Sequence, residues 1–327
     1  MDPVLCYESR NNSCLRSIYP LPVRIVLYMV LGVTVILTVC GNLLVTVSVA
    51  YFKRLHTPTN YLIVSLAVSD LLLGLLVMFP SMIQCVESCW YFGDFFCKVY
   101  MSSDVTLCTS SILNLSFISL DRHYAVCQPL QYKRKITVTI VLLMIVLSWS
   151  VSAFIGFGMI FLKLNIWRIE EFYYDHVACE GGCVLFQSGL SSTVSSVLSF
   201  FIPGIIMLAV YLKIFLVAQK QQRSIQNTNC VRSNSSQTKA TKTLAIIMGA
   251  FISFWTPFFV CNITDPFISY SVPPALFETL VWVGYFNSTI NPFIYAFFYS
   301  WFRKALRLFT SPNIFKSGLS ETALFTK

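Results

Sequence analysis

Seven long apolar stretches, separated by shorter polar segments, account for most of the chain. They cover residues 23–52, 59–86, 97–130, 136–161, 188–216, 241–264 and 276–300. A helix needs about 20 residues to cross a hydrocarbon layer of roughly 30 Å, so each stretch is long enough to span a membrane. The pattern therefore predicts an all-α membrane protein, a seven-transmembrane helix bundle.

The segments outside this bundle, which occupies residues 23–300, are polar or amphipathic. Residues 1–22 lack the apolar core of a cleavable signal peptide. In residues 301–309, apolar and basic positions fall on opposite faces of a helix, as is typical of a helix on a membrane surface. Three further segments are expected to be irregular: residues 162–187, 217–240 and 310–327.

Composition and charge indicate a membrane location and an orientation. Hydrophobic residues make up 56% of the 327 residues and charged residues 11%, whereas soluble domains carry about 25% charged residues. With seven spans, 17 of the 23 Lys and Arg residues fall on the side of the C-terminus, which the positive-inside rule makes cytoplasmic. We therefore expect a multi-pass plasma-membrane protein with residues 1–22 outside and a cytoplasmic tail, residues 310–327.

Acidic residues show the opposite distribution, which bears on the partners. Ten of the 14 Asp and Glu residues fall on the outer side. A net negative outer surface raises the local concentration of cationic ligands. The basic inner surface suits anionic membrane lipids and protein partners, and nucleic acid is not expected.

The third stretch contains carboxylates that an apolar helix would not otherwise carry. At about 1.5 Å per residue, Asp104 lies roughly 10 Å along the helix from Cys97 and roughly 27 Å before Arg122. An ionised side chain inside a membrane costs on the order of 3 kcal/mol, so it indicates a functional site. No Lys or Arg lies at a similar depth in any span. We interpret Asp104 as the counter-ion of an amine, with a pairing to another helix as the alternative.

One characteristic residue or motif lies on each span, and together they resemble a known family. The marks are Asn42, Asp70, Cys97 with Asp121-Arg122, Trp149, Pro203, Phe254-Trp255-Thr256-Pro257 and Asn291-Pro292-Phe293-Ile294-Tyr295. In this order and spacing they resemble a rhodopsin-like G-protein-coupled receptor over residues 23–309. The run from Asn287 to Pro292, continued by Tyr295, Tyr299 and Trp301-Phe302, resembles the fingerprint of trace amine-associated receptors. The stretches 89–93 and 179–183 resemble the subtype 1 branch.

The resemblance implies a binding site for a small protonated amine, such as a primary arylethylamine. Asp104 would bind the ammonium group. The further expected contacts are Cys108, Phe186, Ser195, Ser196, Ser199, Trp255, Phe258, Phe259 and Tyr285. Aromatic faces can add cation–π attraction of up to about 2 kcal/mol, although core packing would also explain them. The serines are candidate partners for a ligand hydroxyl, or simply a polar start of a helix. Some relatives carry a second acid there, which suits diamines, so serine favours a monoamine.

The same resemblance implies coupling to a heterotrimeric G protein, most often of the stimulatory class, with a rise in cAMP. Asp121, Arg122 and Tyr295 would form the switch at the inner end. The triplet departs from the usual family form, because His123 stands where tyrosine is commonest.

Polar residues in the middle of three spans predict a shared network. Asp70 would contact Asn42 and Asn291, and by resemblance a sodium ion can occupy this network. Ordered water is the alternative. No other cofactor is expected.

Cysteines on the outer side indicate disulfides, which form in oxidising compartments. The resemblance implies the pairs Cys97–Cys183 and Cys14–Cys179. A zinc site at Cys179 and Cys183 is the alternative, although no nearby His or Cys completes it. Asn11 begins a glycosylation sequon on the expected outer side. Three other cysteines are interpreted as buried small apolar residues: Cys40, Cys108 and Cys261.

Other functions fit the sequence less well. The three histidines are scattered and no nucleophile–base motif accompanies them, which disfavours an enzyme. A transporter usually shows internal repeats, and none is apparent. An opsin needs a lysine in the seventh span, where residues 276–300 contain none and Tyr285 stands in the corresponding place. Another biogenic-amine receptor, for serotonin or a catecholamine, remains an alternative.

Overall fold

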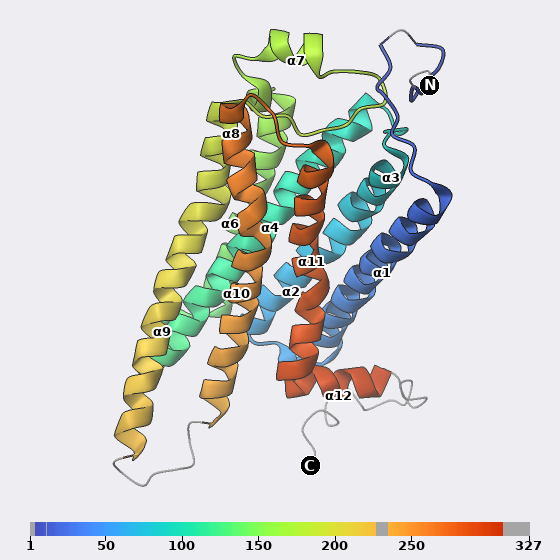
Figure 1. The fold of residues 1–327 in the computed structure, drawn as a ribbon. Helices are drawn as coiled ribbons and strands as arrows, with labels where there is room; N and C mark the ends of the chain where they lie inside the picture. Colours follow the sequence, from blue (N-terminus) through green and yellow to red (C-terminus); the bar gives the residue numbers. More distant parts are fainter. Residues whose placement is uncertain (1–3, 11, 227–234, 310–327) are drawn as a thin grey trace.

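The computed structural model describes residues 4–10, 12–226 and 235–309, and within these ranges seven long helical segments run side by side in one bundle (Figure 1). Their bounds are α1 Leu21–Tyr51; α2 Pro58–Leu72, η2 Leu73–Met78 and α3 Phe79–Glu87; α4 Asp94–Cys127; α6 Val138–Phe161; α8 Gly189–Ser196, η4 Val197–Phe201 and α9 Ile202–Gln226; α10 Ser235–Thr264; and α11 Pro274–Phe298. The predicted fold class is confirmed.

Short helices connect or extend the long ones. They are η1 Lys53–Leu55, α5 Pro129–Lys135, η3 Leu164–Ile166, α7 Glu170–His176, η5 Asp265–Ile268 and α12 Ser300–Phe309. Helix α12 lies across one end of the bundle, while α7 and the N-terminal segment cover the other end (Figure 1). We call these the α12 end and the α7 end.

Several prolines mark where the helices begin or change their winding. Pro58 opens α2 behind Thr57, whose hydroxyl accepts a hydrogen bond from the backbone N–H of Asn60 over 3.3 Å. A π-helical turn, η2, lies shortly before Pro80, and Pro203 follows a second such turn, η4. Because proline lacks an N–H and crowds the preceding turn, a wider turn before it relieves the clash.

The loop prediction for residues 217–240 was largely wrong. Helix α9 continues to Gln226 and α10 begins at Ser235. Short helices, α5 and α7, also occur in segments where none was expected. Hydropathy identifies only the part of a helix that is apolar enough for hydrocarbon, and these turns are polar. The expected tail, 310–327, and the sequon residue Asn11 lie outside the described residues.

Polar side chains lie inside the bundle beside a large apolar core, and further apolar side chains are exposed on its outside. Helix α4 packs against α2, α6 and α9, and Asn114 and Asp121 on it are fully buried, as are Asn42 and Asp70 on α1 and α2. Five helical segments of the described chain are apolar enough to cross a membrane by hydropathy alone: Leu21–Tyr51, Pro58–Glu87, Val138–Phe161, Gly189–Val217 and Ala245–Ile268. Segments α4 and α11 fall short because they carry the polar interior.

Two predictions about surface and core are refined. In α12, Phe302 and Ala305 are buried against the bundle. Its apolar face therefore packs partly on protein and not only on the membrane surface. The expectation that Cys40 is buried was wrong: it is exposed on α1, while Cys108 and Cys261 are partly buried. In a membrane, an apolar side chain is equally well solvated by lipid, so it need not lie in the core.

Candidate functional site

Disulfides close the α7 end. Cys97, in the first turn of α4, is bonded to Cys183, and Cys14 is bonded to Cys179. These are the pairs that the family resemblance implies. Because Cys179 and Cys183 are both in disulfides, they have no thiolates to offer, and the alternative zinc site is excluded.

The N-terminal segment is fastened further by a bridge not expected from the sequence, Cys6–Cys89. The even number of cysteines in the outer segments was the signal that could have indicated it. Close by, the Glu87 carboxylate accepts a hydrogen bond from Arg16 over 2.6 Å and another from Arg24 of α1. The segment is therefore held over the bundle by covalent bonds and by ion pairs.

A cavity of about 330 Å³ lies beneath the α7 end, among α3, α4, α10 and α11, and we call it the inner cavity. Asp104, Asp265 and Glu278 line it, and none of its lining residues is Lys, Arg or His. A smaller cavity of about 60 Å³, which shares Asp104 and Tyr285 with it, reaches further into the bundle, and we call it the deep branch. Uncompensated negative charge of this kind favours a cationic ligand.

Asp104 lies where the inner cavity meets the deep branch. The thiol of Cys108, one turn along α4, donates a hydrogen bond to its carboxylate over 3.4 Å. Among the described residues no Lys, Arg or His forms an ion pair with Asp104. A carboxylate in this setting attracts a hydrogen-bonded ammonium more strongly than it would in water.

The residues expected to contact a ligand lie together, with one exception. The inner cavity or its deep branch is lined by Asp104, Cys108, Phe186, Ser195, Ser199, Trp255, Phe258, Phe259 and Tyr285. Ser196 faces neither: it is fully buried and accepts a hydrogen bond from Asn262 of α10 over 3.0 Å. One residue is about 100° of helical rotation, which turns Ser196 away from the face of Ser195.

The two remaining serines are partly engaged already. The side chain of Gln187 donates to the Ser195 hydroxyl over 3.2 Å, and that hydroxyl donates to the backbone carbonyl of Ser192 over 3.3 Å. The Ser199 hydroxyl donates to the carbonyl of Ser195 over 2.6 Å. Since a hydroxyl has one proton and two lone pairs, Ser199 retains the capacity to accept a hydrogen bond from a ligand.

Aromatic rings form the walls of the deep branch. Trp255 packs edge-on against Phe258, with ring centroids 5.7 Å apart, and Phe259 stacks on Phe200 at 4.4 Å. Tyr285 is 1% exposed, and its hydroxyl has no hydrogen-bond partner among the described residues. A buried hydroxyl without a partner is unfavourable, so this group is available to a ligand near Asp104.

The inner cavity has a roof that the sequence did not reveal. The rings of Phe186 and Tyr270 lie 4.3 Å apart, and the Tyr270 hydroxyl donates to the backbone carbonyl of Gln187 over 3.1 Å. Tyr270, Trp282 and Glu278 were not expected as site residues, although Glu278 belongs to the acidic outer surface. Tyr270 comes from a turn with φ of 55°, where no helical periodicity marks a facing side.

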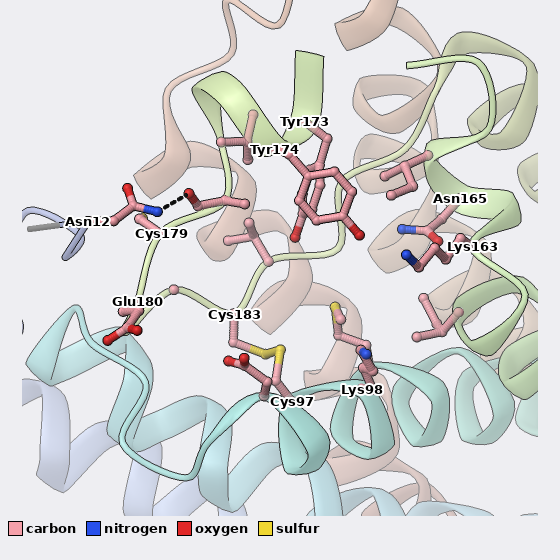
Figure 2. A pocket seen from close by; sticks show the side chains of 18 residues that line it. Asn12, Cys97, Lys98, Lys163, Asn165, Tyr173, Tyr174, Cys179, Glu180 and Cys183 are labelled. Atoms are coloured by element: carbon pink, nitrogen blue, oxygen red, sulfur yellow. Dashed lines mark hydrogen bonds between the residues drawn. A yellow bond between two sulfur atoms is a disulfide. The ribbon is translucent and has the colours of Figure 1, made fainter. Parts of the chain in front are cut away.

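A second cavity, of about 360 Å³, adjoins the first, and we call it the outer cavity (Figure 2). Lys98 of α4 and Lys163 line it together with Asp94 and Glu180. Glu180 is paired with Arg10 of the N-terminal segment over 2.5 Å. Charges of both signs are therefore present in the outer cavity.

Tyrosines from α7 form one side of the outer cavity. Figure 2 shows the rings of Tyr173 and Tyr174 pointing into it, with Lys98, Lys163 and Asn165 across from them. The ammonium of Lys163 lies 5.4 Å from the Tyr174 ring centroid. Burial, and then the neighbouring Tyr174, raise the pKa of Tyr173 above that of an ordinary tyrosine, which is itself protonated at neutral pH.

The α12 end contains the expected switch residues. The guanidinium of Arg122 donates to the carboxylate of Asp121 over 2.8 Å. Asp121 is fully buried and also accepts hydrogen bonds of 2.9 Å from Thr59 of α2 and from Tyr132 of α5. Tyr295 is buried on α11. Arg122 is thus held on its own helix, and Tyr132 is a participant that the sequence did not reveal.

The expected network around Asp70 is present. Its carboxylate accepts hydrogen bonds from Ser111 over 3.1 Å and from Ser288 and Asn291 over 2.8 Å each. Asn42 joins through the backbone of Ser288, to whose carbonyl it donates over 3.1 Å, rather than by a direct bond to Asp70. Asp70 itself therefore joins three helical segments, α2, α4 and α11, and α1 is joined to them through Asn42 and Ser288.

Known proteins resemble this chain over nearly its whole length. The pattern described as 7 transmembrane receptor (rhodopsin family) matches residues 41–295. Trace amine-associated receptor 1 of Macaca mulatta is 49% identical over 98% of both chains. The protein of the same name from Homo sapiens is 48% identical over 98% of this chain and 97% of its own length. Trace amine-associated receptor 4 of Rattus norvegicus is 45% identical, over 98% of this chain and 94% of its own.

Proposed function

The chain belongs to the rhodopsin family of seven-transmembrane receptors and, within it, to the trace amine-associated receptors, and from this premise we propose that its ligands are primary arylethylamines and its signal a rise in cAMP. It is a multi-pass plasma-membrane receptor for amines rather than an enzyme, and its partners are a small molecule and a heterotrimeric G protein.

The observation that carries the ligand proposal is the charge of the inner cavity. Asp104 has no ion-pair partner among the described residues, and no basic residue lines the cavity around it. Hydrogen bonds to charged groups contribute roughly 1.5–3 kcal/mol. An ammonium on Asp104 satisfies the carboxylate, and the buried hydroxyl of Tyr285 supplies a further partner.

The deep branch supplies a place for the aromatic ring of the ligand. Trp255, Phe258 and Phe259 line it beside Asp104, at a volume of about 60 Å³ that suits one ring or part of a ring. A ring hydroxyl would donate to Ser199. The same feature favours the alternative, a receptor for a catecholamine or serotonin, whose hydroxyls would use the same serine.

We assign the α12 end to the cytoplasm and to the G protein. The distribution of Lys and Arg supports this orientation, and so do the disulfides of the α7 end, which form in an oxidising compartment. Arg122, held by Asp121, would be the group released on activation. The stimulatory class of G protein is the proposed partner, and Asn11, on the extracellular side, the proposed glycosylation site.

The Asp70 network fits a sodium ion in its chemistry. Hard cations prefer oxygen ligands. Asp70, Ser111 and Ser288 offer such oxygens, and the side-chain oxygens of Asn42 and Asn291 are buried without a hydrogen-bond partner among the described residues. A bound cation would neutralise Asp70 and stabilise the packing of the helices around it.

The test is a panel of ligands on cells that express the receptor. We expect 2-phenylethylamine and tyramine to raise cAMP at lower concentrations than dopamine or serotonin. Propylbenzene and 2-phenylethanol are neutral analogues of similar shape and should require at least about tenfold higher concentrations. A charged hydrogen bond contributes roughly 1.5–3 kcal/mol, and roughly 1.4 kcal/mol corresponds to a factor of ten in affinity. Equal potency of amines and neutral analogues would refute the amine site. Calcium and nucleotide exchange, measured in parallel, would reveal another G-protein class.

A further inference from the structure

A second carboxylate lines the inner cavity toward its outer rim. Glu278 stands on α11 seven residues before Tyr285, so the two lie on nearly the same face of the helix at levels roughly 10 Å apart. Tyr285 lines both the inner cavity and the deep branch, whereas Glu278 lines only the inner cavity. Asp104 is at the level of Tyr285. The two carboxylates therefore occupy opposite ends of one cavity.

Glu278 differs in its partners from Glu87 and Glu180 at this end, and from Asp265 of the same cavity, whose carboxylate accepts a hydrogen bond from the backbone N–H of Val272 over 3.1 Å. Glu87 is paired with Arg16 and Arg24, and Glu180 with Arg10. Within the described residues Glu278 has no ion pair, although it is partly buried, and the cavity that it faces contains no basic residue. A partly desolvated carboxylate of this kind attracts a cation that the protein itself does not supply.

The face of α11 between the two acids carries unsatisfied polar groups. Trp282 is one turn after Glu278 and lines the same cavity, and its indole nitrogen is buried without a hydrogen-bond partner among the described residues. Tyr285, whose hydroxyl is likewise without a partner, follows within one further turn, and the two rings lie 5.7 Å apart. Acid, indole and hydroxyl thus line the cavity from its rim to Asp104.

We propose that Glu278 is a second cation-binding position and that the receptor binds diamines with one ammonium on Asp104 and the other on Glu278. The proposal rests on the amine site above and extends it. An extended chain advances roughly 1.2 Å per bond, so a gap of roughly 10 Å requires about seven methylene groups between the nitrogens. The serines of α8 and η4 led us to predict a monoamine ligand. With Glu278 as a second cation-binding position, that prediction holds only for the side of the cavity that these serines line.

The test compares ligands and receptor variants at matched surface expression. The ligands are 1,7-diaminoheptane, heptylamine and 1,3-diaminopropane, measured by competition binding on wild-type and Glu278→Gln receptors. We expect wild type to bind 1,7-diaminoheptane about tenfold more tightly than heptylamine, as one additional charged hydrogen bond provides. Glu278→Gln should remove this advantage and leave heptylamine within about twofold of wild type. The short 1,3-diaminopropane cannot reach both acids and should gain nothing from Glu278.

The control variant is Glu171→Gln, which removes an exposed acid of the α7 end that lines neither cavity. Through the long-range field alone it should lower the binding of all three amines only slightly, and that of the two doubly charged diamines somewhat more than that of heptylamine. If Glu278→Gln behaved like Glu171→Gln, or if wild type bound heptylamine and 1,7-diaminoheptane equally, the second position would be refuted while the amine site stood. If no amine bound, the amine site itself would be refuted, and this inference with it.

Discussion

The inner and outer cavities are neighbours of similar size with different chemistry. Their volumes are about 330 and 360 Å³, and they share the wall residues Met101, Val177, Cys183 and Val184. Carboxylates line the inner cavity without any basic residue, whereas Lys98 and Lys163 accompany the acids of the outer cavity. Size alone would therefore not distinguish a ligand site here. The uncompensated charge does, because it determines which ligand gains energy on entering.

The two cavities also differ in what builds them. The inner cavity lies among the long helices, with Asp104, Phe258 and Tyr285 each on a different one. The outer cavity is lined mainly by short connections, namely η3, α7, the loop of residues 177–184 and Asn12 of the N-terminal segment, together with the start of α4 (Figure 2). Changes in the cap should therefore affect the outer cavity first, and the inner cavity only through the shared wall.

We expect the largest effect from removing the disulfide that holds Cys183 in the wall shared by the two cavities. Cys97→Ser releases Cys183, which lines both cavities. Losing a native disulfide costs about 2–5 kcal/mol, so surface expression or amine binding should be lost. Surface immunostaining and radioligand binding measure this, with Cys40→Ser on the exposed side of α1 as the control. Normal expression and affinity of Cys97→Ser would show that the wall stands without its bridge.

The comparison of charge is tested next, by neutralising one residue in each cavity. Asp104→Asn keeps the size of the side chain and one oxygen but removes the charge. Amine affinity should therefore fall by at least about tenfold, and by about a hundredfold if the ion pair is well desolvated, since roughly 1.4 kcal/mol corresponds to a factor of ten in affinity. Lys98→Gln, in the outer cavity, should change affinity by less than about twofold. The measurement is competition binding at matched surface expression. The assignment fails if the two variants have the same affinity for 2-phenylethylamine.

A smaller effect is expected from loosening only the cap. The double change Cys14→Ser and Cys179→Ser frees the N-terminal segment above the outer cavity. Since the inner cavity retains Asp104 and the Cys97–Cys183 wall, agonist potency should fall by only about threefold. Mass mapping of a non-reduced digest of wild type should find Cys14–Cys179. Finding Cys6 joined to Cys179 would contradict this pairing, and a loss of potency as large as that of Asp104→Asn would contradict the separation of the cavities.

The smallest effect concerns the roof. Tyr270→Phe removes only the hydroxyl that donates to the Gln187 carbonyl, at a cost of about 1 kcal/mol. Amine dissociation should become about fivefold faster, since the substituted ring would still pack against Phe186 but would form a looser cover. Tyr174→Phe makes the same change in the outer cavity, and we expect no change in dissociation rate. Equal rates for both variants and wild type would mean that Tyr270 does not close the inner cavity.

The sequence by itself determined where the membrane spans lie and which polar side chains they carry. Transfer of apolar residues into hydrocarbon is a property of local composition, so the long apolar segments could be recognised without knowing their neighbours, five of them within the described chain by hydropathy alone. Asp104 stood out for the same reason: a carboxylate in an apolar helix is costly, and no basic residue at its depth could offset it. The Asp121–Arg122 pair of the α12 end and Asp70 of the second span were likewise recognised from their positions on the spans.

Only the tertiary structure decided which side chains share a cavity. The spacing of Ser195 and Ser199 puts them on one helix face, but only the neighbouring helix shows that Ser196 is bonded to Asn262 outside the cavity. Glu278 lines the cavity and Cys6 is bonded to Cys89 because of how separate segments are rotated and spaced relative to one another. Those quantities are set by packing between residues far apart in the chain, which local hydropathy and periodicity do not encode.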